Sequence, residues 1–478
     1  MKLPEHGMPA DKVFAALEDF RKNDVKWKEG RVFGYVFDPG EKVREVAQKA
    51  YTSFLSENGL DFTVFQSLQI LEKELAAFGA QHLRGGKDAV GNFTSGGTES
   101  IILAVKAARD YYRVKRPDIV TPEIILPTTA HAAFYKAAHY LALKVVQVSV
   151  DPVSFKVSAE TVRQAITPDT IMLVGSAPTY SQGVIDPIAD LGKLALEKNL
   201  WLHTDACMGG FLLPYFKRLG EPAPDFDFSV PGVSSMSMDL HKYAYCPKGA
   251  SLVLYKNKSL RKHQIFACAN WIGYTIINNA VQSSKSGGPM AAAWAVLNHI
   301  GDQGYLEIAR KKLEAVKKIS AGIEKIPGLR LLAPPQMTLI AFTSDTINVF
   351  QIIDEMNSLG WYIQPALSYD NSPAHVHLSV SASNVGWEDK LIEDLEKCTS
   401  IAAAMPEGEL LTSLRPMLKD LDLTNATDEE INGLLAMAGL EGQGLPERMA
   451  EINGVLNELP ASARKAILVS FVNDLFVQ

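Results

Sequence analysis

The feature that most constrains the fold is an alternation of short apolar runs and longer amphipathic stretches from about residue 90 onward. The runs are rich in β-branched residues and have the length of strands, whereas the stretches have the apolar spacing of helices. Such alternation is typical of an α/β domain in which helices cover both faces of a mostly parallel sheet. Strands are predicted at residues 123–126, 144–150, 170–175, 200–204, 234–238 and 250–255, and helices at 98–113, 132–143, 188–198 and 290–300.

The pattern changes on both sides of this segment, which indicates further units in a chain of 478 residues. Because a hydrophobic core stops growing at roughly 250–300 residues, we predict one large domain with smaller units around it. Residues 1–80 are predicted as an N-terminal arm or cap, 81–304 as the large domain, 305–405 as a smaller α+β domain and 406–478 as a helical extension.

The predicted smaller domain and extension have their own patterns. A charged helix at 305–326, ended by Pro327-Gly328, marks the exit from the large domain. Beyond it, strands are predicted at 329–332, 338–343, 362–364 and 375–380, and helices at 349–359 and 387–401. Apolar helix faces of the extension are expected at Ile431, Leu434, Leu435, Met437, Val455, Leu459, Ile467, Phe471 and Leu475.

Composition limits the partners and the compartment. Lys and Arg number 47 against 54 Asp and Glu, so the net charge of −7 disfavours general binding to nucleic acid. The first residues lack the pattern of a signal peptide, and no apolar stretch approaches the roughly 20 residues of a membrane helix. The four cysteines form no CxxC pair and no metal-ligand pattern. We therefore expect a cytoplasmic protein with no transmembrane segment and no metal site.

A lysine at the end of a predicted strand is the sharpest chemical feature. Lys242 stands in the segment DLHKY at residues 239–243, directly after the strand at 234–238. A carbonyl cofactor bound as a Schiff base requires a lysine, and the end of a buried strand is a poor place for a solvated one. A surface lysine on a turn would fit the same local sequence, so this motif alone leaves both interpretations open.

Three other motifs lie at strand ends or helix starts. Asp205 ends the strand at 200–204, where a carboxylate is most often a helix cap but can also hold a pyridine nitrogen protonated. Gly97 and Thr98 open a helix, where backbone amides can approach an anion, although Gly-Gly is also a common turn. His131 follows the strand at 123–126 and, taken alone, is more often a cap or core residue.

Taken together and in this order, the four motifs resemble those of one enzyme family. The segments TSGGTES at 94–100, GVIDP at 183–187, DACMGGF at 205–211 and DLHKY at 239–243 resemble the group II decarboxylase superfamily of fold-type I pyridoxal-phosphate enzymes, and within it the sphingosine-1-phosphate lyases. The resemblance extends from about residue 30 to 400. It implies an aspartate-aminotransferase-like large domain, pyridoxal 5'-phosphate as cofactor and a small amine or amino acid as substrate.

The resemblance also implies roles for individual residues. Lys242 would form the Schiff base, Asp205 would contact the pyridine nitrogen and His131 would stack on the ring. Residues implied to hold the cofactor phosphate are Gly97, Thr98, Ser237 and His241, while Ser284 and Gly287 match a loop that reaches the phosphate of a neighbouring subunit. That loop implies a homodimer with shared active sites. Lys248 matches a second catalytic lysine that is typical of the lyase branch and that simple amino-acid decarboxylases usually lack.

The N-terminal arm departs from the lyase pattern at two substrate-binding motifs. Where these lyases carry Ala-Val-Tyr and Asn-Pro-Leu-His, this chain has YVF at 35–37 and NGLD at 58–61. The corresponding substrate-binding positions include Tyr35, Phe37, Asn58 and Asp61. A carboxylate at Asp61 would repel a phosphate rather than bind it, which leaves a phosphorylated substrate open unless Lys248 or Lys285 supplies the positive charge.

The expected reaction is cleavage of a carbon–carbon bond. A substrate with a β-hydroxyl would undergo retro-aldol cleavage between Cα and Cβ, and Lys248 would act as the base. Decarboxylation of an amino acid is the second hypothesis, and a transaminase is a further enzymatic alternative. A non-catalytic scaffold is the remaining one, although a scaffold has no physical need for Lys242, Asp205 and His131 together.

Overall fold

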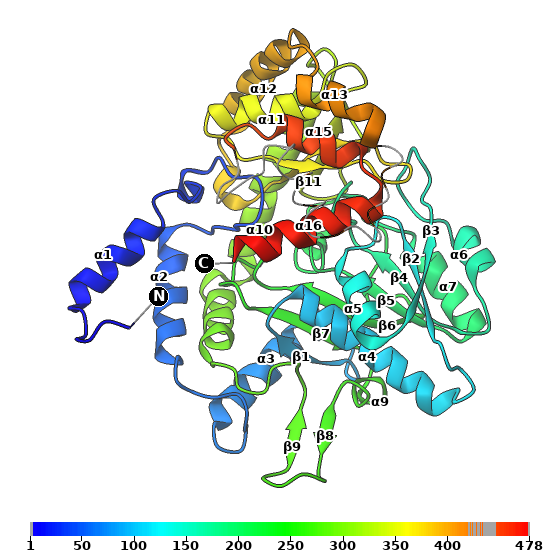
Figure 1. Cartoon of the computed structure of the whole chain (residues 1–478). Coiled ribbons are helices and arrows are strands. Elements are labelled where there is room, and N and C mark those ends of the chain that lie inside the picture. The colour runs from blue at the N-terminus through cyan, green and yellow to red at the C-terminus, as the bar shows by residue number, and fades with distance from the viewer. Residues whose placement is uncertain are drawn as a thin grey trace.

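The computed structural model describes residues 3–418 and 446–476, together with Leu421, Leu423, Thr427, Ile431 and Gly433. The extension positions Leu434, Leu435 and Met437 lie outside the described residues. Figure 1 shows a large sheet surrounded by helices, a smaller sheet beyond one end of it, and C-terminal helices beside that smaller unit.

The large sheet contains all six strands predicted for it and one more. In spatial order it reads β1-β7-β6-β5-β4-β2-β3, with parallel pairing from β6 through to β3 and antiparallel pairing of β7 with both β1 and β6. Its strands are β1 Val90–Thr94, β2 Glu123–Pro127, β3 Lys144–Val148, β4 Thr170–Ser176, β5 Trp201–Asp205, β6 Val233–Asp239 and β7 Ser251–Tyr255. β1 was not predicted, because its five residues include Gly91 and Asn92, which disfavour strands.

Helices cover both faces of this sheet, as the sequence predicted. Alternate residues of β2 separate the two cores: Ile124 packs with α4 and α5, whereas Ile125 packs with α7 and α8. The helices of this unit are α4 Gly97–Lys115, α5 Ala133–Leu141, α6 Ala159–Ala165, α7 Ile188–Lys198, α8 Leu213–Arg218 and α9 Lys258–Arg261. The fold is therefore an α/β fold whose sheet is mostly parallel.

One long helix leads out of the large sheet. The helices predicted at 290–300 and 305–326 are a single element, α10 Gly288–Ile323, which changes direction at Gly301. Gly301 has φ 66°, a left-handed conformation that glycine adopts without strain. The division of the chain at residues 80, 304 and 405 stays a prediction, and this bend is the structural feature nearest to its second boundary.

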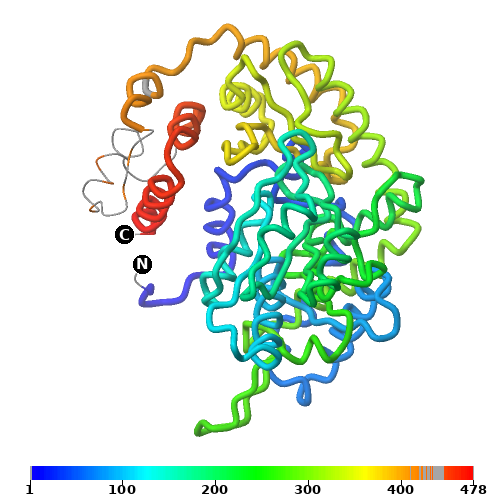
Figure 2. Tube along the Cα trace, turned by 90° about the vertical axis from the view of Figure 1, so that its right-hand side faces the viewer, coloured from blue at the N-terminus to red at the C-terminus, as the bar shows by residue number. Residues whose placement is uncertain are grey.

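The second sheet is small and antiparallel. It has the order β10-β11-β13-β12 and is covered by the two helices predicted for it. Its elements are β10 Arg330–Leu331, β11 Leu339–Thr343, α11 Val349–Ser358, β12 Gln364–Ala366, β13 His375–Ser379, η2 Ala382–Asn384 and α12 Glu388–Ala403. A separate hairpin, β8 Phe266–Cys268 with β9 Ile276–Asn278, projects from the lower edge of the molecule (Figure 2).

Parts of the N-terminal arm and of the C-terminal segment pack against these units. The arm consists of α1 Ala10–Phe20, η1 Trp27–Glu29, α2 Glu41–Ser53 and α3 Gln66–His82. Its Phe33 is fully buried in the core of the second sheet, while α2 packs along α10. The described C-terminal helices, α13 Glu409–Leu418, α15 Ala450–Glu458 and α16 Ala461–Leu475, enclose a core of their own. In the described part of the chain, no helix has both the length and the apolar character needed to cross a membrane.

Candidate active site

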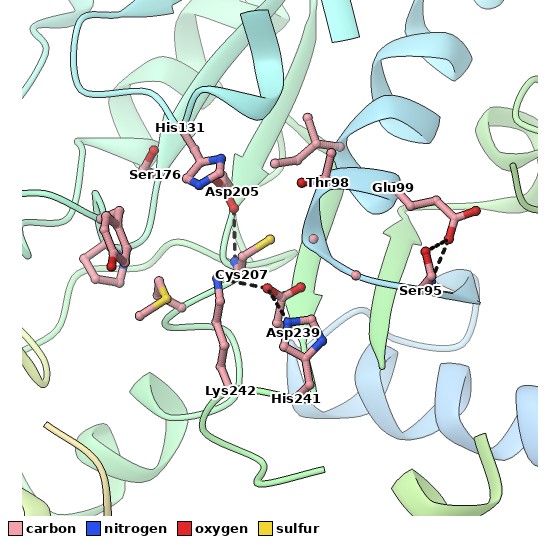
Figure 3. A pocket seen from close by; sticks show the side chains of 16 residues that line it. Ser95, Thr98, Glu99, His131, Ser176, Asp205, Cys207, Asp239, His241 and Lys242 are labelled. Carbon is pink, nitrogen blue, oxygen red and sulfur yellow. Dashed lines mark hydrogen bonds and ion pairs between the residues drawn. The ribbon is translucent and has the colours of Figure 1, made fainter. Parts of the chain in front are cut away.

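A cavity of about 380 Å³ opens where β2, β4, β5 and β6 end. The carboxyl ends of neighbouring parallel strands meet at one edge of a sheet, which is where open α/β sheets bind ligands. Figure 3 shows the side chains that converge there. The lining residues are Ser95, Gly96, Gly97, Thr98, Glu99, Ile101, His131, Ser176, Pro178, Tyr180, Asp205, Cys207, Met208, Asp239, His241 and Lys242.

Lys242 is held by a buried carboxylate at the base of the cavity. Its Nζ lies 2.9 Å from Oδ2 of Asp239, a side chain that is only 2% exposed (Figure 3). Burial acts to lower the pKa of Lys242, but the nearby negative charges, Asp239 foremost, outweigh it and raise this pKa above its ordinary value. Burial also acts against ionisation of Asp239, yet the charge of Lys242 keeps the Asp239 pKa below its usual range.

His241 shares the same carboxylate. Its Nε2 lies 3.6 Å from Oδ2 of Asp239, and its Nδ1 accepts a hydrogen bond of 3.4 Å from the amide of Ala250. Burial lowers the pKa of His241 more than Asp239 raises it, so the imidazole is neutral near pH 7. Asp239 is thus shared between the lysine and a neutral imidazole.

Asp205 lies at the end of β5 with one carboxylate oxygen already occupied by the protein. Its Oδ1 accepts hydrogen bonds from the amide of Cys207 and from Oγ of Ser237, both at 3.1 Å. Ser237 is fully buried behind Asp205 and does not line the cavity. Ser237 was expected to hold the cofactor phosphate, but in the structure its hydroxyl binds the Asp205 carboxylate.

The N-terminus of α4 and the turn before it form another wall of this cavity. Glu99 turns back to accept hydrogen bonds from the amide and hydroxyl of Ser95, at 2.6 and 2.7 Å, which fixes the turn (Figure 3). A Cβ on Gly97 would lie 2.8 Å from both Oδ2 of Asp239 and Sγ of Cys207, so only glycine fits. The first amides of a helix have no acceptor within the helix and are available to an anion. Thr98 presents its exposed side chain at this end.

His131 reaches the cavity from the loop after β2. Its Nδ1 accepts a hydrogen bond of 3.1 Å from the amide of Ala133, which orients the ring. Its ring meets that of Tyr180 edge to face at 6.4 Å, and Tyr180 stacks in turn on the buried His377 at 4.4 Å. The side chain of His131 is exposed, as suits a ring that can cover a flat ligand in an open cavity.

Lys248 lies beside a second cavity, of about 460 Å³, that adjoins the first at His241. Its Nζ donates a 3.5 Å hydrogen bond to the carbonyl oxygen of His241 and stands 5.2 Å from the ring centre of Phe37. Partial burial and then the positive charge of Lys242 lower the pKa of Lys248 to about 8. The amine can therefore exchange a proton near neutral pH.

The remaining predicted site residues lie outside the first cavity. Tyr35 is 63% exposed and packs on Tyr362. Oδ1 of Asn58 accepts a hydrogen bond from the amide of Lys285, and the Gly59 amide donates to the Lys285 carbonyl at 2.7 Å. These bonds join the loop at 57–60 to the loop at 284–287. Of the other predicted residues there, Asp61 and Ser284 are exposed, while Gly287 is buried.

Sequence reasoning gave no role to three residues of the site. Asp239 belonged to a recognised motif, and its position three residues before Lys242 was the available signal. Tyr180 lies in a loop without a periodic pattern, so only the structure places its ring beside His131. His203 was visible two residues before Asp205, where the alternation of a strand puts both side chains on one face.

The cavity has the groups that pyridoxal phosphate requires. A lysine for the carbonyl, a carboxylate for the pyridine nitrogen, a ring to cover the cofactor and free helix amides for the phosphate all border one space. Oδ1 of Asp239 is buried without a hydrogen-bond partner among the described residues, which leaves capacity for a further donor. The residues present therefore fit this cofactor.

Comparisons with known proteins agree with this geometry. The family model described as the pyridoxal-dependent decarboxylase conserved domain matches residues 60–345, and one for a C-terminal HTH domain of pyridoxal-dependent enzymes matches residues 412–474. The second match covers most of the helical extension at 406–478, for which the sequence motifs had shown no resemblance to a family.

Individual relatives are similar over most of the chain. A sphingosine-1-phosphate lyase of Oryza sativa is 40% identical, with 85% of this chain and 75% of the relative covered, and one of Dictyostelium discoideum is also 40% identical, with 82% and 73% covered. The solved structure of a Burkholderia pseudomallei sphingosine-1-phosphate lyase has a TM-score of 0.80 and 36% identity, with 84% of this chain and 93% of that chain covered. The chain therefore belongs to the pyridoxal-dependent decarboxylase family, and it is a pyridoxal-phosphate-dependent carbon–carbon lyase similar to the sphingosine-1-phosphate lyases.

Proposed function

We propose that this lyase cleaves the Cα–Cβ bond of a β-hydroxy amine of the sphingosine-1-phosphate class by a retro-aldol reaction. The observation that carries the proposal is the place of Lys248. Its side chain borders the second cavity, and its amine donates a hydrogen bond to the carbonyl of His241, the residue at which the two cavities meet. A base at that junction can serve a hydroxyl on the carbon next to the one that reacts at Lys242.

Apart from Lys248, the residues of the site act on the cofactor. Pyridoxal phosphate, when bound at Lys242, supplies a sink for the electron pair of a bond broken at Cα. Asp205 keeps the pyridine nitrogen protonated, His131 covers the ring, and the amides of Gly97 and Thr98 bind the phosphate. Asp239 holds the Lys242 amine in place and, with His241, lines the floor of the site.

The proton and bond changes balance with Lys248 as base. Its neutral amine takes the proton of the β-hydroxyl, the Cα–Cβ bond breaks, and a carbonyl forms at Cβ. The former Cα then takes up one proton, which the protonated Lys248 returns, so Lys248 is neutral again and the products are one aldehyde and one shorter amine. Decarboxylation would leave Lys248 without a role, because no hydroxyl proton has to be removed.

The charged groups near Lys248 determine whether the second cavity can bind a phosphorylated head group of the substrate. Arg44 lies in the second cavity, but both oxygens of Asp38 accept from its Nη1, at 2.7 and 2.6 Å, which uses part of its charge. Phe37 offers a ring and no hydroxyl. The cavity therefore suits a β-hydroxy amine with an apolar portion, and Lys248 and Lys28 are the cations there that could meet a phosphate.

A homodimer in the cytoplasm is part of the proposal. The loops at 57–60 and 284–287 are joined by hydrogen bonds and lie at the surface of one chain, where they can face the cavity of a second chain. None of the four cysteines is in a disulfide, which is typical of a reducing compartment.

Substitution of Lys248 separates a base from a mere positive charge. The purified enzyme would be given phosphorylated and unphosphorylated long-chain β-hydroxy amines and amino acids, with aldehyde and CO₂ measured separately. We expect aldehyde, and we expect both Lys248→Gln and Lys248→Arg to lower kcat about a hundredfold, because arginine keeps the charge but does not release its proton. CO₂ without aldehyde, or full activity of Lys248→Arg, would contradict the proposal.

The pH dependence gives a second test of Lys248. Its amine accepts a proton only when neutral, that is above its pKa of about 8, so kcat/KM should rise with pH through about 8. The rise should be absent in Lys248→Gln. A profile that is the same in both enzymes would assign the base to another residue.

A further inference from the structure

A row of polar side chains crosses the buried interior of the large sheet and ends at Asp205. Trp201, His203 and Asp205 alternate along β5 and so share one face. In the parallel register with β6, His203 lies beside Ser235 and Asp205 beside Ser237. Four of the five are at most 2% exposed, and Asp205 is 7% exposed. Central parallel strands are usually apolar, so polar groups here are stable only if they bond to one another.

These five side chains form one continuous hydrogen-bonded chain. Nε1 of Trp201 donates to Oγ of Ser235 at 2.8 Å, and that Oγ lies 2.8 Å from Nδ1 of His203. On the other side of the ring, Nε2 lies 3.3 Å from Oγ of Ser237, which donates to Oδ1 of Asp205 at 3.1 Å. Each hydroxyl therefore has a neighbour on both sides.

The two ends of the chain give it a direction. The indole N–H of Trp201 can only donate, and an ionised carboxylate at Asp205 can only accept. Ser237 donates its single hydroxyl proton to Asp205, so in its contact with His203 it can only accept a hydrogen bond from Nε2–H. Ser235 accepts from Trp201, and its own proton then points to a bare Nδ1.

Reversal of this direction would follow if Asp205 carried a proton. The carboxyl group would then donate to Ser237, Ser237 would donate to Nε2 of His203, and the ring proton would move to Nδ1. Ser235 would receive two donors, from Trp201 and His203, while its own proton lost its acceptor in the chain. The fixed N–H of Trp201 thus disfavours the reversed arrangement by one buried hydrogen bond.

We propose that Trp201, Ser235, His203 and Ser237 act as a one-way hydrogen-bonded chain that keeps Asp205 ionised and oriented toward the cavity, with His203 in the Nε2–H form. His203 and Ser237 are thereby positioning residues. They touch neither substrate nor cofactor, and they act through the carboxylate that meets the pyridine nitrogen. The inference rests on the proposed role of Asp205, and the identity of the substrate does not enter it.

The surroundings of His203 agree with a neutral ring. The His203 ring meets the Phe134 ring edge to face at 5.7 Å, and among the described residues Asp205 is the charged group that acts on its titration. Burial lowers the pKa of His203 to about 4, although Asp205 opposes the shift. One imidazole proton is therefore present near pH 7, and its position depends on the direction of the chain.

Nitrogen-15 NMR of the full-length protein tests the direction without any substrate. With histidine labelled at both ring nitrogens, the His203 signals are assigned as those missing from His203→Gln. We expect a bare Nδ1 and a protonated Nε2 at pH 7, both with and without pyridoxal phosphate. A proton on Nδ1, or equal amounts of both forms, would overturn the proposal.

Substitutions then test whether the chain acts on Asp205. Ser237→Ala and His203→Leu break it, whereas His203→Gln keeps one donor and one acceptor. We expect the first two to weaken the binding of pyridoxal phosphate, measured by its near-visible absorbance, about tenfold or more, and His203→Gln to stay within about threefold. Ser100→Ala is the matched control, because Ser100 is also a fully buried hydroxyl of this domain, and its hydrogen-bond partners among the described residues are the hydroxyls of Thr94 and Ser251.

The outcomes separate this proposal from the proposed reaction. Equal weakening by Ser237→Ala and Ser100→Ala would show a general effect of a lost buried hydroxyl and would overturn the chain. If His203→Leu does not fold, Trp201→Phe serves, since it removes only the terminal donor and should raise the Nδ1–H fraction of His203. All these readouts stand even if the enzyme turns out to release CO₂ rather than an aldehyde.

Discussion

The cofactor cavity and the loops expected to bind substrate are built in contrasting ways. Asp205, Asp239 and Lys242 stand at or just beyond the ends of buried strands, and each is fixed by bonds within one chain. Asn58, Asp61 and Ser284 stand on surface loops that bond mainly to each other or to themselves. The first group forms a site within a single chain, whereas the second group forms none.

The difference shows which part of the reaction the chain controls by itself. Breaking a bond at Cα needs groups fixed within a fraction of an ångström, and a sheet buried on both faces supplies that rigidity. Recognition of the substrate's far end tolerates loops and, in our proposal, a second subunit. The predictions below test this contrast from its strongest side to its weakest.

Removal of the lysine should have the largest effect. We expect Lys242→Ala to lower kcat at least about a thousandfold and to abolish the near-visible band of bound pyridoxal phosphate, because the group that holds the cofactor's carbonyl is lost. Absorbance and single-turnover assays measure both changes. Lys193→Ala, on the exposed surface of α7, is the control. A band that persists in Lys242→Ala would place the cofactor on another lysine.

Neutralisation of Asp205 should have the next largest effect. Asp205→Asn keeps the shape but removes the charge, so we expect kcat to fall about a hundredfold while the fold, followed by circular dichroism, stays intact. Asp205→Glu keeps the charge and should recover part of the loss. Equal activity of the asparagine and glutamate variants would mean that the carboxylate's charge does not matter.

Mixed dimers test whether the loops belong to the neighbour's site. Ser284→Glu should lower activity about tenfold by placing a carboxylate near the cofactor phosphate, and Lys242→Ala is inactive by itself. If sites are shared, a mixed dimer of the two variants contains one intact site and recovers about half of wild-type activity. If each chain forms its own site, the mixed dimer gains nothing over the Ser284→Glu subunit alone.

Asp61 should give the smallest effect. Its Oδ1 accepts from both the amide and the hydroxyl of Thr63, so it closes its own turn, and these bonds lower its pKa. We expect Asp61→Ala to change KM less than about threefold, as is usual for an exposed position. A large fall in KM for a phosphorylated substrate would instead show that this carboxylate faces the substrate and repels its phosphate.

Most of the elements were predictable because their patterns are local. The six strands predicted for the large sheet and the helix at 188–198 appear within a residue or two of their predicted ends, since apolar periodicity and turn residues set them. β1 was missed because Gly91 and Asn92 hide its pattern, and the long α10 was divided because Gly301 reads as an end. The antiparallel place of β7 depends on its pairing with β1 and β6, which no local pattern specifies.

The candidate site was predictable to the same extent. The sequence by itself determined the chemistry, because Lys242, Asp205, His131 and Gly97-Thr98 each stand where a strand ends or a helix begins, and parallel strands bring those points to one edge. Only the tertiary structure decided what sets the charge of each group: that Asp239 meets Lys242, that Lys248 lies against His241 where the two cavities meet, and that a chain from Trp201 ends on Asp205. Charge and proton position depend on burial and on neighbours from other strands, and these distances exist only once the chain has folded.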